Sequence, residues 1–145
     1  MTRPLDTLVR LNEWEVDQKR RALGEQLKRL QELQQALSDL AAELTREQAS
    51  AAGAPAEAGL LYGGYAQHVI ARRTDIETRI RHKEADVAAA REALSDAYLE
   101  LKKYEIAQRQ REEREAEEAA RVEQAFLDEI GLQGHRRRNS TPQEQ

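Results

Sequence analysis

The chain has 145 residues, of which 39% are hydrophobic, 34% are charged and only 4% are aromatic. A compact globule of this size usually needs a broader apolar core with more aromatic residues, whereas a composition rich in Ala, Glu, Leu, Arg and Gln is typical of long helices and coiled coils. The formal net charge of −4 gives no strong attraction to nucleic acid or to a membrane surface. The absence of cysteine excludes a disulfide framework and a Cys-ligated metal site.

The positions of glycine and proline predict two long helices. Only Gly24 interrupts residues 5–48, and residues 65–130 contain neither glycine nor proline. Pro4 suits the first turn of a helix, and Gly131 and Gly134 suit a helix stop. We therefore expect a first helix over about residues 4–48, a turn over about 49–60 and a second helix over about 61–130. Residues 1–134 are expected to form a single domain, followed by a disordered basic tail over 135–145.

Apolar residues recur every seven positions in both predicted helices, as the seam of a coiled coil requires. In the first helix the two columns are Val9, Val16, Leu23, Leu30, Leu37 and Leu44, and Leu5, Asn12, Lys19, Gln26, Leu33 and Leu40. In the second helix they are Ile80, Val87, Leu94 and Leu101, and Val69, Ile76, Lys83, Ala90, Ala97 and Tyr104. The pattern predicts an all-α fold in which two long helices form an antiparallel coiled-coil hairpin.

Two registers of the hairpin satisfy these columns. The first places Leu44 opposite Val69, and the second places Leu44 opposite Tyr62. The second register requires Gly63 and Gly64 to lie inside the second helix, so we favour the first.

Four polar residues interrupt the predicted seam, namely Asn12, Lys19, Gln26 and Lys83. Polar seam residues commonly fix register and orientation at some cost in stability, and this is the interpretation that we favour. The alternative is a hairpin that is deliberately marginal and deformable.

In either register the first helix ends opposite about residues 101–108, where the apolar seam of the second helix also ends. The next core positions are Gln108, Arg111, Glu115 and Glu118. We therefore expect the second helix to project beyond its partner as a lone helix about 30 Å long. Its end carries an apolar stripe of Val122, Phe126 and Ile130, and a stripe without an intramolecular partner favours an intermolecular one.

The sequence shows no catalytic constellation, so we expect no enzyme activity, no cofactor and no metal site. The three histidines, His68, His82 and His135, are far apart, and His82 beside Asp86 is better explained as part of a solvated face than as a zinc site. No glycine-rich phosphate-binding loop is present. The basic residues 135–138 are too few in an acidic protein to favour nucleic-acid binding over a solubilising tail.

Three aromatic residues lie in positions that suit an interface. Trp14 falls off the seam, and Tyr62 and Tyr65 cluster near the predicted turn. Exposed aromatic residues are typical interface anchors. The alternatives are that Trp14 packs along its own helix and that the tyrosines cap the end of the hairpin.

The layout resembles the flagellar FliJ family, whose type III secretion relatives are the YscO-like stalk proteins. The resemblance spans essentially the whole chain and includes tyrosines after a short turn. Its other parts are the start LDTLVRLNEWEVDQKRRALGEQ, the late segment ELKKYEIAQ and the terminal segment AFLDEIGLQGHRRR.

The resemblance implies a non-enzymatic stalk of the flagellar protein export apparatus at the cytoplasmic face of the inner membrane. FliJ-like proteins insert the end with both termini into the hexameric export ATPase, contact the export-gate membrane protein with the hairpin end, and handle export chaperones. Carried onto this chain, contacts with the ATPase ring fall on Leu5, Leu8, Leu11, Val122, Phe126 and Ile130. Contacts with the export gate fall on Tyr62, Tyr65 and Val69, with His68 as the alternative match for the family's aromatic residue.

Other functions compete with this one. A generic coiled-coil tether would form a stable oligomer through the seam, whereas the hairpin predicts a monomer when free. A nucleic-acid-associated hairpin would bind through Arg136, Arg137 and Arg138 with steep salt dependence. An enzyme is disfavoured because two helices enclose no pocket.

Overall fold

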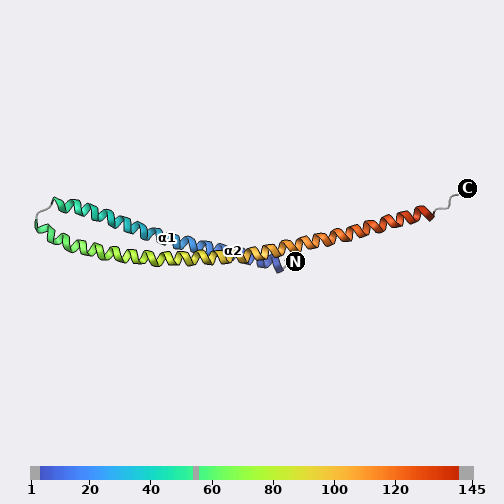
Figure 1. Cartoon of the computed structure of the whole chain (residues 1–145), viewed down its shortest axis with the longest axis horizontal. Coiled ribbons are helices and arrows are strands. Elements are labelled where there is room, and N and C mark those ends of the chain that lie inside the picture. Colours follow the sequence, from blue (N-terminus) through green and yellow to red (C-terminus); the bar gives the residue numbers. More distant parts are fainter. Residues whose placement is uncertain (1–3, 54–55, 141–145) are drawn as a thin grey trace. The chain divides into compact units, whose positions relative to one another are not determined.

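Two long helices contain nearly all of the residues that the structure, a computed structural model, describes. These residues are 4–53 and 56–140, and the side chains of 56–62 are not described. Helix α1 spans Pro4–Ala52, with 49 residues, and helix α2 spans Ala56–Ser140, with 85 residues. They run side by side in opposite directions (Figure 1), and the described part of the chain contains no strand. The predicted all-α hairpin of two long helices is therefore confirmed.

Both helices extend into the predicted turn, so the boundaries near residues 49–60 need correction. Helix α1 continues to Ala52, and α2 already begins at Ala56 and includes Gly63 and Gly64. No described glycine has a positive φ. Alanine is the strongest helix former and is frequent here, and a glycine costs only about 1 kcal/mol in a helix. The alanines therefore outweigh the glycines that were expected to stop the helix.

Helix α2 also continues past its predicted end near residue 130. It passes through Gly131 and Gly134 and ends at Ser140. Residues 135–140 of the predicted disordered tail are therefore helical, while 141–145 lie outside the described residues. Arg137 and Arg138 occupy the last turn, where a positive charge interacts favourably with the helix dipole. This interaction, together with a hydrogen bond of 3.2 Å between the side chains of Asn139 and His135, supports the additional helix turns.

The chain divides into two compact units, of which the larger, Leu11–Glu100, is the hairpin unit. Within it, the described heptad positions are buried or half-buried. The best-buried side chains are Val16, Leu40, Val69, Ile76 and Val87, each less than 8% exposed. Leu40, Val69 and Ile76 form a cluster against which Leu37, Leu44, Tyr65 and Ile80 pack. The seam expected from the seven-residue repeat is therefore the core of this unit.

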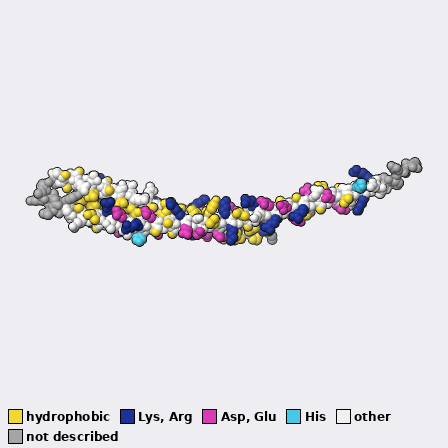
Figure 2. Space-filling view, viewed as in Figure 1, with side chains coloured by type: hydrophobic (Ala, Val, Ile, Leu, Met, Phe, Trp, Pro, Cys, Tyr) yellow, Lys and Arg dark blue, Asp and Glu magenta, His cyan; other side chains and the backbone are white. Residues whose placement is uncertain are grey.

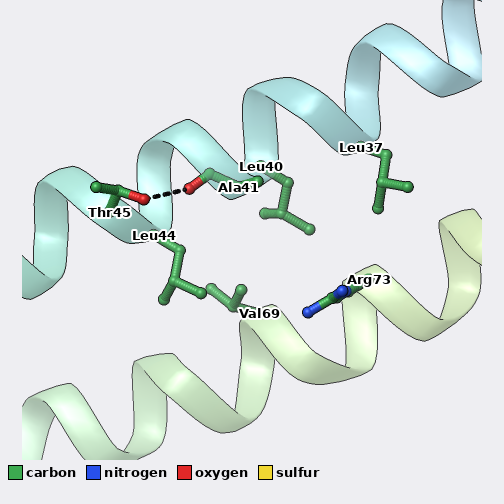
Figure 3. Close-up of a pocket in the computed structure, with 7 residues that line it drawn as sticks. All are labelled: Leu37, Leu40, Ala41, Leu44, Thr45, Val69 and Arg73. Atoms are coloured by element: carbon green, nitrogen blue, oxygen red, sulfur yellow. Dashed lines mark hydrogen bonds between the residues drawn. The ribbon is translucent and has the colours of Figure 1, made fainter.

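The hairpin adopts the favoured register. The side chains of Leu44 and Val69 point toward each other from facing helices (Figure 3). Val69 lies opposite Leu44, as the favoured register requires. Gly63 and Gly64 are nevertheless helical in this register, so their place inside α2 does not distinguish the two registers.

One polar contact crosses the middle of the seam. The Lys83 amine donates hydrogen bonds to Gln26 Oε1 and to Asp86 Oδ2, both at 3.1 Å. The Lys83 side chain is only 19% exposed, as expected for a residue of the seam. A lysine at such a position keeps its aliphatic part in the seam and its charged end in a hydrogen-bonding environment.

The outer surface of the hairpin unit carries ion pairs between residues four apart on the same helix. The pairs are Arg21 with Asp17, Arg29 with Glu25, Arg73 with Glu77 and Arg79 with Asp75. Figure 2 shows acidic and basic side chains interspersed on the visible face. Each such pair stabilises a helix by only about 0.2–0.5 kcal/mol. The hairpin is therefore held together mainly by its seam.

The second unit consists of Met1–Arg10 and Leu101–Gln145 and is called here the terminal unit. Val9 and Leu101 are its buried residues, at 8% and 7% exposure. The Gln108 side chain donates a hydrogen bond to the Asp6 carboxylate, so the start of α1 lies beside this part of α2. From residue 109 to 140 every residue is exposed except the half-buried Gly134. Residues 109–140 of α2, the lone helix, thus extend beyond the first turns of α1, as the sequence predicted.

Candidate docking surfaces

An apolar cavity lies between α1 and α2 in the hairpin unit, near its closed end. It has a volume of about 230 Å³. Its lining residues are Leu37, Leu40, Ala41, Leu44, Thr45, Val69 and Arg73 (Figure 3). The Thr45 hydroxyl is engaged in a hydrogen bond of 3.0 Å to the Ala41 carbonyl, and Arg73 pairs with Glu77. Because these polar groups already have partners, the cavity suits an apolar side chain.

The residues expected to contact an export gate lie beside this cavity, with different accessibility. Val69 is only 3% exposed and belongs to the seam, while Tyr65 is half-buried against the same cluster. The side chain of Tyr62 lies outside the described residues, and His68 is exposed. Sequence reasoning missed Ile70, which is 62% exposed on the outer surface next to Val69. Its signal was an isoleucine outside both heptad columns.

The lone helix carries the largest group of exposed apolar side chains in the terminal unit. Val122, Phe126 and Ile130 are 62%, 64% and 50% exposed. Their spacing of four residues places them along one face of the helix. Leu127 and Leu132 are also exposed but lie off this face. We call Val122, Phe126 and Ile130 the apolar stripe, and none of the described residues covers it.

Charged residues separate the apolar stripe from the seam. Arg111 pairs with Glu115 at 3.3 Å, and Arg121 lies 4.0 Å from Glu118. All four side chains are largely exposed. This segment therefore offers a solvated surface of mixed charge between the last seam residues and the stripe.

The three leucines predicted for the same function at the start of α1 are divided between the units. Leu5 is half-buried, and Leu8 is 36% exposed, both in the terminal unit. Leu11 is 53% exposed and belongs to the hairpin unit, as does the 56% exposed Trp14. The structure therefore brings Leu5 and Leu8, but not Leu11, into one unit with the apolar stripe.

Few features of the described residues suit catalysis or metal binding. No group of three or more His, Asp or Glu side chains among them is arranged to hold a metal ion. His82 lines an open cleft with Arg29, Lys83 and Asp86, where the charged groups are engaged with one another or with neighbours on their own helix. In the described part of the chain, neither helix contains a segment apolar enough to cross a membrane.

Comparison with known proteins gives a family for this arrangement. The sequence model of the flagellar FliJ protein family matches residues 1–140. The chain belongs to the FliJ family. Flagellar FliJ proteins from two strains of Caulobacter vibrioides, NA1000 and ATCC 19089, are each 32% identical to it over 132 residues, covering 91% of this chain and 94% of the relative. No solved structure matches significantly.

The range matched by the family model includes both candidate docking surfaces, because it contains the hairpin unit and the lone helix to Ser140. It confirms the resemblance drawn from the sequence and associates the chain with the flagellum. The roles of the individual surface residues remain predictions.

Proposed function

We propose that this FliJ-family protein is a non-enzymatic stalk of the flagellar protein export apparatus. In this proposal the lone helix and the first turns of α1 bind the hexameric export ATPase and activate it. The closed end of the hairpin binds the cytoplasmic domain of the export-gate membrane protein, and the hairpin also receives export chaperones. The protein would then work at the cytoplasmic face of the inner membrane.

The observation that carries this proposal is the uncovered apolar stripe. Burying a Val, Ile or Phe side chain contributes about 1.5–3 kcal/mol, so three such residues supply a substantial part of a binding free energy. Helices of this length depend on tertiary contacts for most of their stability. A partner that covers Val122, Phe126 and Ile130 therefore stabilises both the complex and the lone helix itself.

The proposed gate contact rests on the cavity of about 230 Å³ and on the exposed Ile70, which follows the cavity residue Val69 in the sequence. A partner side chain of leucine size fits an apolar space of this kind, and filling it recovers packing that the isolated hairpin lacks. Tyr65 stays in the proposed contact because it packs against the same cluster. Val69 contributes by shaping the cavity, since it is buried.

In this proposal the chain supplies no reacting group. It activates the ATPase only by binding to the ring. A helix that binds between subunits stabilises the assembled ring by mass action. The mixed charge of residues 109–121 gives few fixed contacts, which suits a helix that exchanges between equivalent sites of a ring.

The test is ATP hydrolysis by the cognate export ATPase with and without this protein. We expect stimulation by the native chain and its loss in the double variant Phe126→Ala/Ile130→Ala. Leu132→Ala is the matched control, because Leu132 is equally exposed but lies on the other side of the helix. Equal stimulation by all three proteins would remove the stripe from the proposal, and the absence of both stimulation and binding at about 10 µM would remove the ATPase.

A generic coiled-coil tether is the competing function. It predicts a stable oligomer through the seam, and sedimentation equilibrium distinguishes it from the monomer that we propose. The buried seam of the hairpin unit favours the monomer, because its apolar residues are already paired within one chain.

A further inference from the structure

One flank of the hairpin unit carries a shallow cleft that neither candidate docking surface uses. It has a volume of about 300 Å³. Arg20 from α1 and Arg91, Leu94, Ser95 and Tyr98 from α2 line it. The cleft therefore combines two guanidinium groups with an apolar and aromatic floor, and it contains no carboxylate.

Both arginines of the cleft lack an ion-pair partner among the described residues. Within residues 4–53 and 63–140 neither Arg20 nor Arg91 takes part in an ion pair or a hydrogen bond, whereas the adjacent Arg21 pairs with Asp17 at 3.1 Å. Like charges on facing helices repel each other, so this pair does not help to close the hairpin. A carboxylate placed between them would form charge-assisted hydrogen bonds with both.

Helix α1 also carries Gly24 on this flank. This glycine lies four residues after Arg20 and three before Leu27, so the three share one face of α1. A Cβ atom added at Gly24 would meet nothing within 4 Å. The hairpin thus has no packing need for glycine, although glycine in a helix interior costs about 1 kcal/mol relative to alanine. A missing side chain on this face lets another backbone approach closely.

Exposed apolar side chains complete this flank. Tyr98 is 43% exposed and Leu27 is 37% exposed. Tyrosine and arginine are the residue types that most often dominate binding energy at protein interfaces. The flank is therefore complementary to a partner that supplies both carboxylates and large apolar side chains.

The hairpin unit of a second copy does not meet that requirement, and the lone helix of a second copy, which carries glutamates beside Val122 and Phe126, is the alternative that the mass measurement below tests. One cleft of the hairpin unit has Glu15, Asp96 and Glu100 in its lining, but its apolar side chains are only Ala93 and Ala97. Exposed ion pairs contribute little to affinity, and association must first offset the lost translational and rotational freedom of both partners. Charge pairing between two hairpin units is therefore insufficient.

We propose that the flank formed by Arg20, Gly24, Leu27, Arg91 and Tyr98 docks an acidic amphipathic helix of a partner protein. Its carboxylates lie on the two arginines, its backbone crosses near Gly24, and its leucine-sized side chains cover Leu27 and Tyr98. This docking site is separate from the cavity near the closed end and from the apolar stripe, and it stands whether or not those surfaces bind the ATPase and the gate.

The test uses the full chain and a synthetic helical peptide of about 20 residues with Glu and Leu along one face, a length at which a helix is populated. Binding is measured by isothermal titration for the native chain, Arg20→Gln/Arg91→Gln and Gly24→Ala. We expect the double variant to weaken binding at least about 10-fold, because it removes both charge-assisted hydrogen bonds. Gly24→Ala should raise the thermal unfolding midpoint of the free chain and yet weaken binding of the peptide.

The control variant is Arg46→Gln/Arg72→Gln, which makes the same change in net charge at exposed arginines outside the cleft. It should bind the peptide like the native chain, and a peptide with Gln in place of Glu should not bind. Equal losses in both double variants, or no binding at about 1 mM peptide, would overturn the proposal. A doubling of the chain's mass that disappears in Arg20→Gln/Arg91→Gln would also overturn it, because the occupant would then be a second copy.

Discussion

The hairpin unit and the lone helix consist of the same kind of secondary structure, but they treat apolar side chains in opposite ways. In the hairpin unit, residues such as Val16, Ile76 and Val87 are less than 8% exposed because a facing helix covers them. In the lone helix, Val122 and Phe126 are more than 60% exposed, and none of the described residues lies over them. An apolar position stabilises the chain itself in the first case and is available to a partner in the second.

The difference originates where the seven-residue repeat stops. Up to Leu101 the seam positions are mostly apolar and are buried or half-buried, whereas the next positions beyond Gln108, such as Arg111 and Glu115, are charged and exposed. Apolar residues return only at Val122, after α1 has no more residues to offer as a partner. The apolar residues before the end of the seam thus stabilise the hairpin, and the apolar residues beyond it are available to bind a partner.

The largest change in the free energy of unfolding should come from replacing an isoleucine of the seam by alanine. The same substitution on the apolar stripe gives the comparison. Ile76 is 7% exposed in the seam and Ile130 is 50% exposed on the apolar stripe. We expect Ile76→Ala to lower the free energy of unfolding by about 2–4 kcal/mol, because it leaves a cavity in the core cluster, and Ile130→Ala to change it by less than about 0.5 kcal/mol. Urea unfolding followed by circular dichroism measures both. Similar losses in the two variants would mean that the lone helix has a covered face.

A smaller effect is expected from the polar contact inside the seam. Replacing Lys83 by leucine removes its hydrogen bonds to Gln26 and Asp86 but puts an apolar side chain into the seam. We expect Lys83→Leu to raise the free energy of unfolding by about 1–2 kcal/mol, since polar seam residues reduce stability. Lys28→Leu, at an exposed position off the seam, is the control and should have little effect. Destabilisation by Lys83→Leu would show that the polar contact is a net stabiliser.

The cavity near the closed end of the hairpin gives a third prediction. Ala41 lines it, whereas the neighbouring Ala42, which is also exposed, does not. Ala41→Leu should raise the free energy of unfolding by about 0.5–1 kcal/mol by filling part of the space. Ala42→Leu should leave the thermal unfolding midpoint unchanged. If Ala41→Leu instead lowers the midpoint, the space is too small for an added side chain, and the proposed gate contact loses its basis.

The smallest effect should be found among the surface charges of the lone helix. Arg111→Ala removes the ion pair with Glu115 at 3.3 Å. Such a pair is worth about 0.3 kcal/mol, so amide hydrogen exchange around residues 107–115 should become slightly faster while the hairpin unit is unaffected. A global loss of stability would indicate that this part of α2 takes part in cooperative folding of the hairpin.

Much of the fold was predictable because a heptad repeat determines which residues face a partner helix. The columns from Val9 to Leu44 and from Val69 to Leu101 fall on the buried side as expected. The helix ends were not predictable from glycine alone, since Gly131 and Gly134 are accommodated in a helix at modest cost. The repeat fixes which side faces the partner, and it gives no information on how far the two helices separate.

The candidate surfaces were predictable to different degrees. The apolar stripe of Val122, Phe126 and Ile130 follows from spacing alone, and the structure shows it exposed. The cavity beside Leu44 and the cleft between Arg20 and Arg91 depend on the register and on the local separation of two helices. They could therefore not be predicted from the sequence. The assignment of any of these residues to a particular partner remains a prediction.

Amide hydrogen exchange of the full chain, alone and with the cognate export ATPase, tests the central claim most directly. The free chain should exchange rapidly over residues 109–140 and slowly at the seam around Ile76, because only the seam is covered. Addition of the ATPase should slow exchange at residues 119–133 and leave the flank around Arg91 unchanged. Unchanged exchange at residues 119–133, with protection appearing elsewhere, would contradict the claim that the apolar stripe is the surface that binds the ATPase.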